Sequence, residues 1–401
     1  MTNAEDSISA ALARATVVVD VRSPDEFAKG AIAGAVNLPL FSNNERAEIG
    51  TLYKAMGKEK AVQRGLGVMG EKLGEFVAAF TPYKAERLLV YCARGGMRSA
   101  TVVGLLRGLG FDVVQLSGGY KAFRNHLLLQ LESHLPPRLI VLHGQTGVGK
   151  TLLLRRLGNF LDLEDAAQHR SSVFGAMNRT PRTQQQFEAH LLAALEGLDY
   201  SQPVWVEGES RKIGSVLMPD ALRRRMQASP CVLVTAPLAV RVGRIVAEYS
   251  QDNPATRQEA EAALLSIARL LGAERTQTLV RLVRSGEFGL VAADLLQHYY
   301  DPLYAHSMRG YSYELTLSSE DLDATVETLE AFALELGKQT VKRDLPGRKN
   351  TQVPVHRQDV FAGIQCQPAP YRDGFLPDAG KPLGNLSLPE QYKHLLLNHP
   401  K

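Results

Sequence analysis

The stretch that decides the fold is RLIVLHGQTGVGKTLLLRRLG, residues 138–158. An apolar run typical of a buried strand leads into a glycine-rich loop, and a helix-like segment follows. The loop fits the pattern G-x-x-x-x-G-K-[ST] in full, and in this setting its backbone N–H groups cradle phosphate groups. The residues expected to bind phosphate here are Gly144, Gly147, Gly149, Lys150 and Thr151. The sequence therefore predicts a phosphate-binding turn inside a parallel α/β domain.

The acidic partner of this loop is expected on the strand-like segment PVWVEGES, residues 203–210. It offers Glu207 or Glu209 where nucleotide hydrolases more often have an aspartate. Either residue can equally be an ordinary acid at the end of a strand. At the loop, Lys150 is expected to reach a terminal phosphate and Thr151 to help bind Mg²⁺. We therefore treat both glutamates as candidate phosphate-site residues.

Two arginine-containing segments lie downstream of the loop. Residues 168–182, QHRSSVFGAMNRTPR, form a polar segment that suits contacts to phosphate or an RNA backbone, although an ordinary surface loop explains it equally well. Residues 238–249, LAVRVGRIVAEY, carry Arg241 and Arg244 on one helical side. This pair resembles the mobile arginines of small-molecule kinases with the same loop, yet solvated surface charges give the same pattern.

The chain is predicted to have three parts. Residues 10–133 alternate short apolar runs with helical patterns, as a parallel sheet requires, and two prolines then mark a boundary. Residues 137–343 form the phosphate-loop domain, with an almost wholly helical segment at about 255–306. Residues 344–401 are rich in Pro and Gly without periodicity, which is typical of an extended or disordered tail.

A second reactive loop is predicted in LLVYCARGGMRSA, residues 88–100. Cys92 follows a strand-like run, and Gly95 and Gly96 allow the backbone to curl so that successive N–H groups point inward. A helix beginning near Ser99 and the guanidinium of Arg98 would complete an anion-binding ring. Such surroundings favour a thiolate. A buried structural cysteine is the alternative, and the glycines and arginines favour a nucleophile.

The composition sets the remaining bounds. The chain is 45% hydrophobic and 22% charged, with a formal net charge of +4 that permits a nucleic-acid partner without arguing for one. Three cysteines are too few for a disulfide framework or a zinc site, which favours a reducing compartment. The acidic start MTNAEDSISA is unlike a signal peptide, and no apolar run is long enough to span a bilayer. A cytoplasmic protein is expected.

The first domain resembles a rhodanese domain, the sulfurtransferase module that carries sulfur as a cysteine persulfide. DVRSPDEFAKGAIAGAVNLPL (20–40) is similar to its entry and LSGGY (116–120) to its closing turn. In the commonest rhodanese loop the arginine comes one position sooner, whereas CARGGMR has the cysteine-x5-arginine spacing of dual-specificity phosphatases. This longer ring would admit a larger anion. A phosphatase is therefore an alternative, although Tyr91 stands where that loop usually has histidine.

The two domains together resemble the tRNA 2-selenouridine synthase family, from about residue 10 to about 340. The segments YCARGGMRS, ERAEIGTLYKAMG, EDAAQHRSSVFG, EGESRKIG and YYDPLY carry this resemblance. It implies a rhodanese-like domain followed by a P-loop NTPase-like domain. It also implies a two-stage change at the wobble uridine of the tRNA anticodon stem-loop. Geranyl diphosphate first alkylates the sulfur of 2-thiouridine, and selenophosphate then supplies selenium as the S-geranyl group leaves.

The resemblance also assigns site residues. Cys92 is the catalytic residue and carries selenium as a selanyl-sulfide. Arg94 and Arg98 would hold the phosphate of selenophosphate, while amides of the loop at Gly95 and Gly96 would stabilise charge. The ligand of the P-loop stays open between geranyl diphosphate, a nucleotide and a tRNA phosphate. We favour geranyl diphosphate, because alkylation requires a diphosphate leaving group to be neutralised.

The expected partners follow from the same resemblance. Besides tRNA they include a selenophosphate-supplying enzyme, and no membrane is expected. No tightly bound cofactor and no metal site are expected, apart from Mg²⁺ at the P-loop. A P-loop kinase or ATPase with a rhodanese-like sulfurtransferase domain is the main rival, which ATP turnover without tRNA would favour. The candidate tRNA or substrate contacts are Arg170, Arg179, Arg182, Arg211, Lys212, Arg241 and Arg244.

Overall fold

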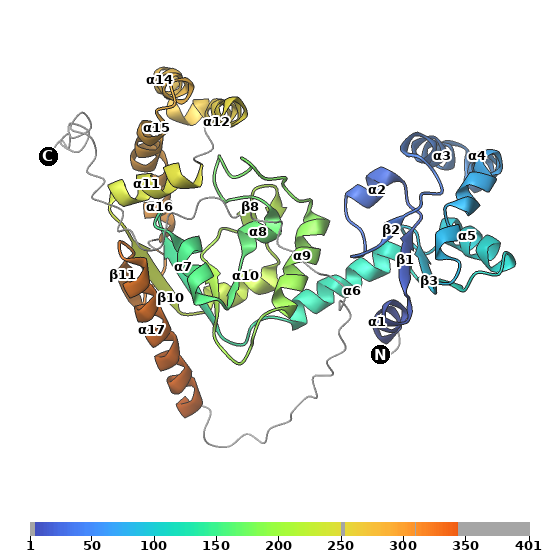
Figure 1. Cartoon of the computed structure of the whole chain (residues 1–401), viewed down its shortest axis with the longest axis horizontal. Helices are drawn as coiled ribbons and strands as arrows, with labels where there is room; N and C mark the ends of the chain where they lie inside the picture. Colours follow the sequence, from blue (N-terminus) through green and yellow to red (C-terminus); the bar gives the residue numbers. More distant parts are fainter. Residues whose placement is uncertain (1–4, 250–252, 309, 344–401) are drawn as a thin grey trace.

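The computed structural model describes residues 5–249, 253–308 and 310–343. Two α/β domains follow one another along the chain, and a helix, α6 (Gly119–Ser133), lies between them (Figure 1). Each domain is built on a parallel sheet, so the fold class predicted from the sequence is confirmed. The predicted tail at 344–401 lies outside the described residues.

The N-terminal sheet has the strand order β2-β1-β3-β4, and all its neighbours run parallel. Its strands are β1 (Val17–Asp20), β2 (Val36–Asn37), β3 (Leu88–Tyr91) and β4 (Val113–Gln115). Strand β3 lies in the interior of the sheet and is buried at every position, as its unbroken apolar run predicts. Parallel strands end at one edge, so the residue that follows β3 lies at the carboxyl edge of the sheet.

Helices surround this first sheet. They are α1 (Glu5–Arg14), α2 (Pro24–Ala28), α3 (Asn43–Met56), α4 (Lys58–Ala78), the 3₁₀ turn η1 (Thr81–Tyr83), α5 (Met97–Gly108) and α6. Helices α3 and α4 form a hairpin that turns at Gly57, whose φ of +84° suits glycine. Ser42 caps α3 by accepting a hydrogen bond from the Glu45 N–H, and Glu45 reaches back to the Ser42 N–H. Helix α5 begins two residues before Ser99, close to the predicted start.

The second sheet has the order β11-β10-β5-β7-β6, again parallel throughout. Its strands are β5 (Leu139–Gly144), β6 (Phe160–Leu161), β7 (Val204–Glu207), β10 (Cys231–Thr235) and β11 (Leu315–Ser318). Strand β5 is central and fully buried, which places the phosphate loop at the middle of the carboxyl edge. A small antiparallel hairpin, β8 (Lys212–Ile213) with β9 (Val216–Leu217), follows β7.

The helices of this second domain fall into two sets. Those close to the sheet are α7 (Lys150–Leu157), α8 (Leu163–Ala167), α9 (Gln184–Glu196), α10 (Asp220–Gln227), α11 (Leu238–Glu248) and α17 (Leu322–Arg343). A separate apolar cluster unites α11 with the helical segment that follows it. That segment comprises α12 (Pro254–Ser266), α13 (Ala268–Leu271), α14 (Ala273–Arg284), α15 (Phe288–Leu295), the π-helical turn η2 (Leu296–Tyr300) and α16 (Asp301–Met308).

The two domains share one apolar core. It joins β3 and α6 of the first domain to α9 and β7 of the second without interruption. Polar contacts add to it: Arg124 of α6 pairs with Glu188 of α9 at 2.5 Å, and the Thr183 hydroxyl donates to the Lys29 carbonyl at 2.5 Å. Helix α6 therefore belongs to the packing of both domains.

None of the helices in the described ranges is long and apolar enough to cross a membrane.

Candidate functional site

The cysteine loop lies at the carboxyl edge of the first sheet, directly after β3. Gly95 adopts φ +60°, and a side chain there would meet the backbone of the neighbouring Gly118–Gly119 turn at 2.7 Å. That turn fastens the loop, because the Tyr120 N–H donates to the Cys92 carbonyl at 2.9 Å. The two glycine pairs thus shape a single rigid cradle around the cysteine.

Cys92 is 3% exposed, and hydrogen bonds surround its sulfur. The Ser99 hydroxyl donates to Sγ at 3.2 Å. Burial raises the pKa of the thiol, but the Ser99 hydroxyl, the backbone N–H groups of Arg94 and Ser99, and the charge of Arg98 outweigh it, so the net pKa is lowered. A buried position and a lowered pKa therefore occur together at Cys92, whereas from the sequence a buried cysteine and a reactive one are alternatives.

The two arginines of this loop do not form the closed anion-binding ring that the sequence predicts. The guanidinium of Arg98 donates to the carboxylate of Glu26 at 2.7 Å, so its fork is engaged by α2. Arg94 is exposed and reaches the sulfur only through its backbone N–H. Arg98 still lowers the Cys92 pKa by its charge, but an anion that used its fork would have to compete with Glu26.

Two further residues of the first domain support the loop and were not identified from the sequence. Gln115 donates to the Gly95 carbonyl at 2.8 Å and to the Ser99 hydroxyl at 2.8 Å, so it orients the group that faces sulfur. Arg22 forms a buried pair with Asp20 at 2.6 Å and lies 4.0 Å from the Tyr120 ring centroid. Only three-dimensional proximity reveals these partners, since they come from β4 and the end of β1.

The phosphate loop joins β5 to α7, as predicted. Gly147 and Gly149 adopt φ of +82° and +88°, so the loop turns through left-handed backbone that favours glycine. Lys150 donates to the Gly144 carbonyl at 2.9 Å and lies 3.4 Å from the Glu207 carboxylate. Burial lowers the pKa of Lys150, but nearby carboxylates, led by Glu207, outweigh it and raise the pKa. The lysine is therefore a fixed cation within the loop.

Arg241 and Arg244 of α11 both reach this loop. Arg241 donates to the Thr146 carbonyl at 2.8 Å and pairs with Asp301 of α16 at 2.6 Å. Arg244 donates to the Val148 carbonyl at 2.6 Å. Both side chains thus lie against the phosphate loop, and neither is simply a solvated surface charge.

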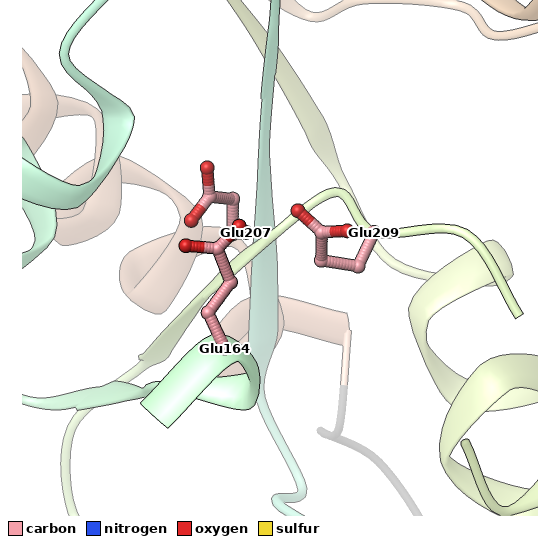
Figure 2. Close-up of side chains that lie close together, drawn as sticks. All are labelled: Glu164, Glu207 and Glu209. Atoms are coloured by element: carbon pink, nitrogen blue, oxygen red, sulfur yellow. The ribbon is translucent and has the colours of Figure 1, made fainter. Parts of the chain in front are cut away.

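A group of three carboxylates lies beside Lys150. Figure 2 shows Glu164 of α8, Glu207 at the end of β7 and Glu209 just beyond it, turned toward one another. Oxygen atoms of the three lie within 4.8 Å of one another. Burial and repulsion from the other carboxylates raise the pKa of Glu164 to about 8 and that of Glu209 to about 7. The sequence singled out Glu207 and Glu209, but Glu164 gave no signal because it lies more than forty residues upstream.

These carboxylates have the chemistry of a hard-cation site. Mg²⁺ prefers oxygen ligands, and it would relieve the repulsion that raises these two pKa values. The hydroxyl of Thr151 lies 3.4 Å from Glu207 and could join them. The sequence predicts Mg²⁺ at the P-loop with Thr151 as its ligand and no other metal site, and it does not identify this group of three carboxylates as a candidate site.

The predicted RNA-contacting arginines of the 168–182 segment are mostly engaged within the protein. Arg170 pairs with Glu248 at 2.5 Å and lies 4.9 Å from the Tyr249 ring. Arg179 donates to the Glu164 carbonyl at 3.2 Å, and Arg182 to the Ala166 carbonyl at 3.0 Å. Arg179 and Arg182 therefore hold this segment against α8, which carries Glu164, and Arg170 ties it to the end of α11.

The two remaining basic candidates lie on the hairpin that follows β7. Arg211 is exposed and lies 3.6 Å from Asp220, and Lys212 is exposed. Of the seven predicted contact residues, these two are the most open to an approaching RNA backbone. Their role stays a prediction.

Two family models cover the chain. Residues 5–126 match the rhodanese-like domain, and residues 137–334 match the tRNA 2-selenouridine synthase AAA domain. The first match ends within α6, and the second begins after that helix, at Pro137.

Relatives match over most of their length. The chain is 36% identical to the tRNA 2-selenouridine synthase of Serratia proteamaculans, covering 74% of this chain and 87% of that protein. It is 35% identical to the enzyme of that name from Cronobacter sakazakii, over 79% and 93% of the two chains. The corresponding protein of Pseudomonas syringae pv. tomato is 37% identical, over 72% and 87%. Relatives that match most of this chain and most of their own length, together with the two family models, show that the chain belongs to the tRNA 2-selenouridine synthase family of enzymes.

Proposed function

We propose that this protein converts 2-thiouridine to 2-selenouridine at the wobble position of tRNA, through an S-geranyl intermediate. Geranyl diphosphate would place its diphosphate on the P-loop, and selenophosphate would supply selenium at Cys92. The observation that carries the proposal is the presence of two glycine-rich loops in domains that share one apolar core, one with a buried thiol whose pKa is lowered and the other with a buried lysine. The names of the relatives supply the nucleoside.

The first step is an alkylation. The sulfur of 2-thiouridine attacks the first carbon of the geranyl group, the C–O bond to diphosphate breaks, and the base loses its N3 proton. Lys150, the loop N–H groups and the end of α7 would neutralise the departing diphosphate. Glu164, Glu207 and Glu209 would hold Mg²⁺, which supplies further charge compensation for that leaving group.

The second step exchanges the S-geranyl group for selenium: the selenium of selenophosphate, which stays at the selenide level, bonds to C2 of the base, the C–S bond breaks so that geranyl thiol leaves, and water takes the phosphoryl group as phosphate. Cys92 is the residue that would carry selenium from selenophosphate, and its thiolate character supports this role. Arg94 and Arg98 are the cations nearest the loop, although Arg98 would first have to release Glu26 in order to grip a phosphate. Selenophosphate would come from a supplying enzyme, which we expect to act together with this protein.

The experiment separates the two loops. We expect Lys150→Ala to abolish geranylation of tRNA while radioactive selenium from selenophosphate still labels Cys92. Cys92→Ser should show the reverse: S-geranyl-2-thiouridine accumulates and 2-selenouridine is absent. Mass spectrometry of tRNA nucleosides measures both products. Normal geranylation by Lys150→Ala would contradict the assignment of the P-loop, and ATP turnover without tRNA would favour the kinase or ATPase alternative.

A further inference from the structure

A group of aromatic rings lies next to the phosphate loop, in a place that the proposed chemistry leaves without a role. His143 is the last residue of β5 before Gly144, and its ring centroid lies 4.3 Å from that of Tyr311 and 5.7 Å from that of Tyr313. Both tyrosines come from the connection between α16 and β11. Tyr304 of α16 lies 6.0 Å from Lys150 Nζ. We call these four residues the aromatic cluster.

His143 carries a polar atom that has no partner in the described part of the chain. The residue is 8% exposed, and its Nε2 is buried without a hydrogen bond. Burial, with a smaller contribution from Lys150, lowers the pKa of His143 to about 4, so the ring is neutral at neutral pH. A neutral imidazole presents one donor and one acceptor nitrogen. Leaving a buried polar atom unpaired is destabilising, so a partner is expected in the working complex.

The position of the ring is tightly set by the strand that carries the carboxylates. Gly208 stands between Glu207 and Glu209, and a side chain there would lie 2.7 Å from the His143 ring. The residue next to the P-loop acids is therefore small enough to let the imidazole pack against its backbone. On its other side the ring meets Tyr311, which is 38% exposed and is thus the outward-facing member of the cluster.

We propose that the aromatic cluster receives the pyrimidine base of the target nucleotide, with Tyr311 as the stacking ring and His143 Nε2 as a hydrogen-bond partner. The inference rests on the proposed function, because alkylation requires the sulfur of the base to lie about 3–3.5 Å from the carbon that leaves the diphosphate. A base extruded from an RNA loop is held by aromatic stacking and by hydrogen bonds to its edge. The cluster offers both beside the loop where the diphosphate would lie.

A prenyl chain is the other occupant that aromatic rings could hold. A hydrocarbon, however, would leave His143 Nε2 unpaired, whereas a uracil ring offers either N3–H as a donor or O4 as an acceptor to this nitrogen, depending on the tautomer of the imidazole. The unpaired nitrogen therefore favours the base.

Photocrosslinking locates the base without any need for geranyl diphosphate. The full-length protein is mixed with an anticodon stem-loop RNA that carries 4-thiouridine at the wobble position, irradiated with near-ultraviolet light, and digested for mass spectrometry. We expect the crosslink on the peptide that contains Tyr311 or on the one that contains His143, with the yield reduced in Tyr311→Ala. Crosslinks confined to the cysteine loop or to the hairpin at Arg211 would overturn the proposal.

Binding measurements then test the type of contact. Removing one stacked base contact costs about 1–3 kcal/mol, so Tyr311→Ala should raise the KM for a 2-thiouridine stem-loop about 5- to 150-fold, while Tyr311→Phe stays near wild type. Affinity for geranyl diphosphate should be the same in all three proteins. Weaker binding of geranyl diphosphate with an unchanged KM for RNA would mean that the rings hold the prenyl chain, and no change in either would also overturn the proposal.

The outcomes separate this inference from the proposed function. If wild-type protein neither binds nor uses geranyl diphosphate, the P-loop assignment fails, yet the crosslink still reports where the base lies. His143→Phe adds a structural control. Because it removes an unpaired buried nitrogen and keeps a ring, its melting temperature should equal or exceed that of wild type, while its kcat/KM with RNA falls. A fall in both quantities together would indicate a merely structural role.

Discussion

At the scale of single residues, Ser99 governs the ionisation of Cys92. Its hydroxyl is the largest of the groups that favour the thiolate over the thiol, and Gln115 keeps that hydroxyl in place. The other cysteine in the described residues, Cys231, has a pKa raised by burial, so the two buried thiols differ through their neighbours and not through exposure.

We expect Ser99→Ala to raise the pKa of Cys92. The folded-state pKa lies below its ordinary value, so losing a stabilising donor moves the titration to higher pH and leaves less thiolate at neutral pH. The measurement is the pH dependence of iodoacetamide alkylation at Cys92, followed by peptide mass spectrometry. Ser133→Ala, on the exposed side of α6, is the control. An identical pH profile in both variants would show that Ser99 does not tune the thiol.

Glu164 gives a second prediction at this scale, which concerns stability. Its pKa of about 8 in the folded protein exceeds the ordinary value, so the folded state binds more protons than the unfolded state between pH 4.5 and 8. Stability without metal should therefore fall as pH rises through that window. We expect Glu164→Gln to raise the melting temperature at pH 8, by about 1–2 °C for each kcal/mol gained when both domains unfold in one transition.

Added Mg²⁺ should reverse the order of the melting temperatures of wild type and Glu164→Gln. Wild type should gain thermal stability from added Mg²⁺, because an ion that binds only the folded state stabilises it, and Glu164→Gln should gain much less. Glu274→Gln, an exposed glutamate on α14, should behave like wild type. Equal Mg²⁺ responses in the three proteins would show that the carboxylate group is not a cation site.

At the scale of elements, the turn before α6 and the cysteine loop behave as one unit. A side chain at Gly119 would clash with the Cys92 carbonyl, and Gly119 itself has φ +58°. The start of one helix and the end of one strand are thus locked by backbone contact, which requires glycine on both sides.

Gly119→Ala should therefore disturb the cysteine loop. The left-handed backbone alone costs about 1–3 kcal/mol, and the clash adds to it. We expect a lower melting temperature together with a loss of the fast alkylation of Cys92. Gly104→Ala, inside α5 with open space around it, should be neutral or slightly stabilising. Unchanged alkylation in Gly119→Ala would show that the turn does not shape the loop.

The sequence predicts elements well where a local pattern is enough. The buried runs of β3 and β5, the two glycine loops and the helix ended by Pro136 all follow from neighbouring residues. It fails where distant segments meet: Glu164 with Glu207, Gln115 with Ser99, and Glu26 with Arg98. The Glu26 pairing also shows that a motif position does not determine where a guanidinium lies.

At the scale of the whole molecule, one apolar core runs through both domains. Phe123 and Leu127 of α6 lie in it and are each 3% exposed. A domain boundary drawn at the prolines therefore divides the chain but does not divide the packing. The sequence did not predict this shared core, because the apolar residues of α6 are equally consistent with packing inside one domain.

We expect Leu127→Ala to destabilise both domains together. A buried leucine-to-alanine change costs about 2–5 kcal/mol, and calorimetry should show one transition that moves as a whole. Val103→Ala, whose side chain belongs to the core of the first domain alone, should also shift that single transition. Two separate transitions, only one of which moves with Leu127→Ala, would show that the domains unfold independently.

The shared helix has a consequence for the order of events on the RNA. If one domain swung against the other to carry a nucleoside from the phosphate loop to Cys92, it would have to open apolar packing around α6. The shared core therefore favours a fixed arrangement of the two domains. The RNA would then move instead of the domains. On the proposed route, the anticodon loop would leave the phosphate loop after alkylation and bind again at the cysteine loop.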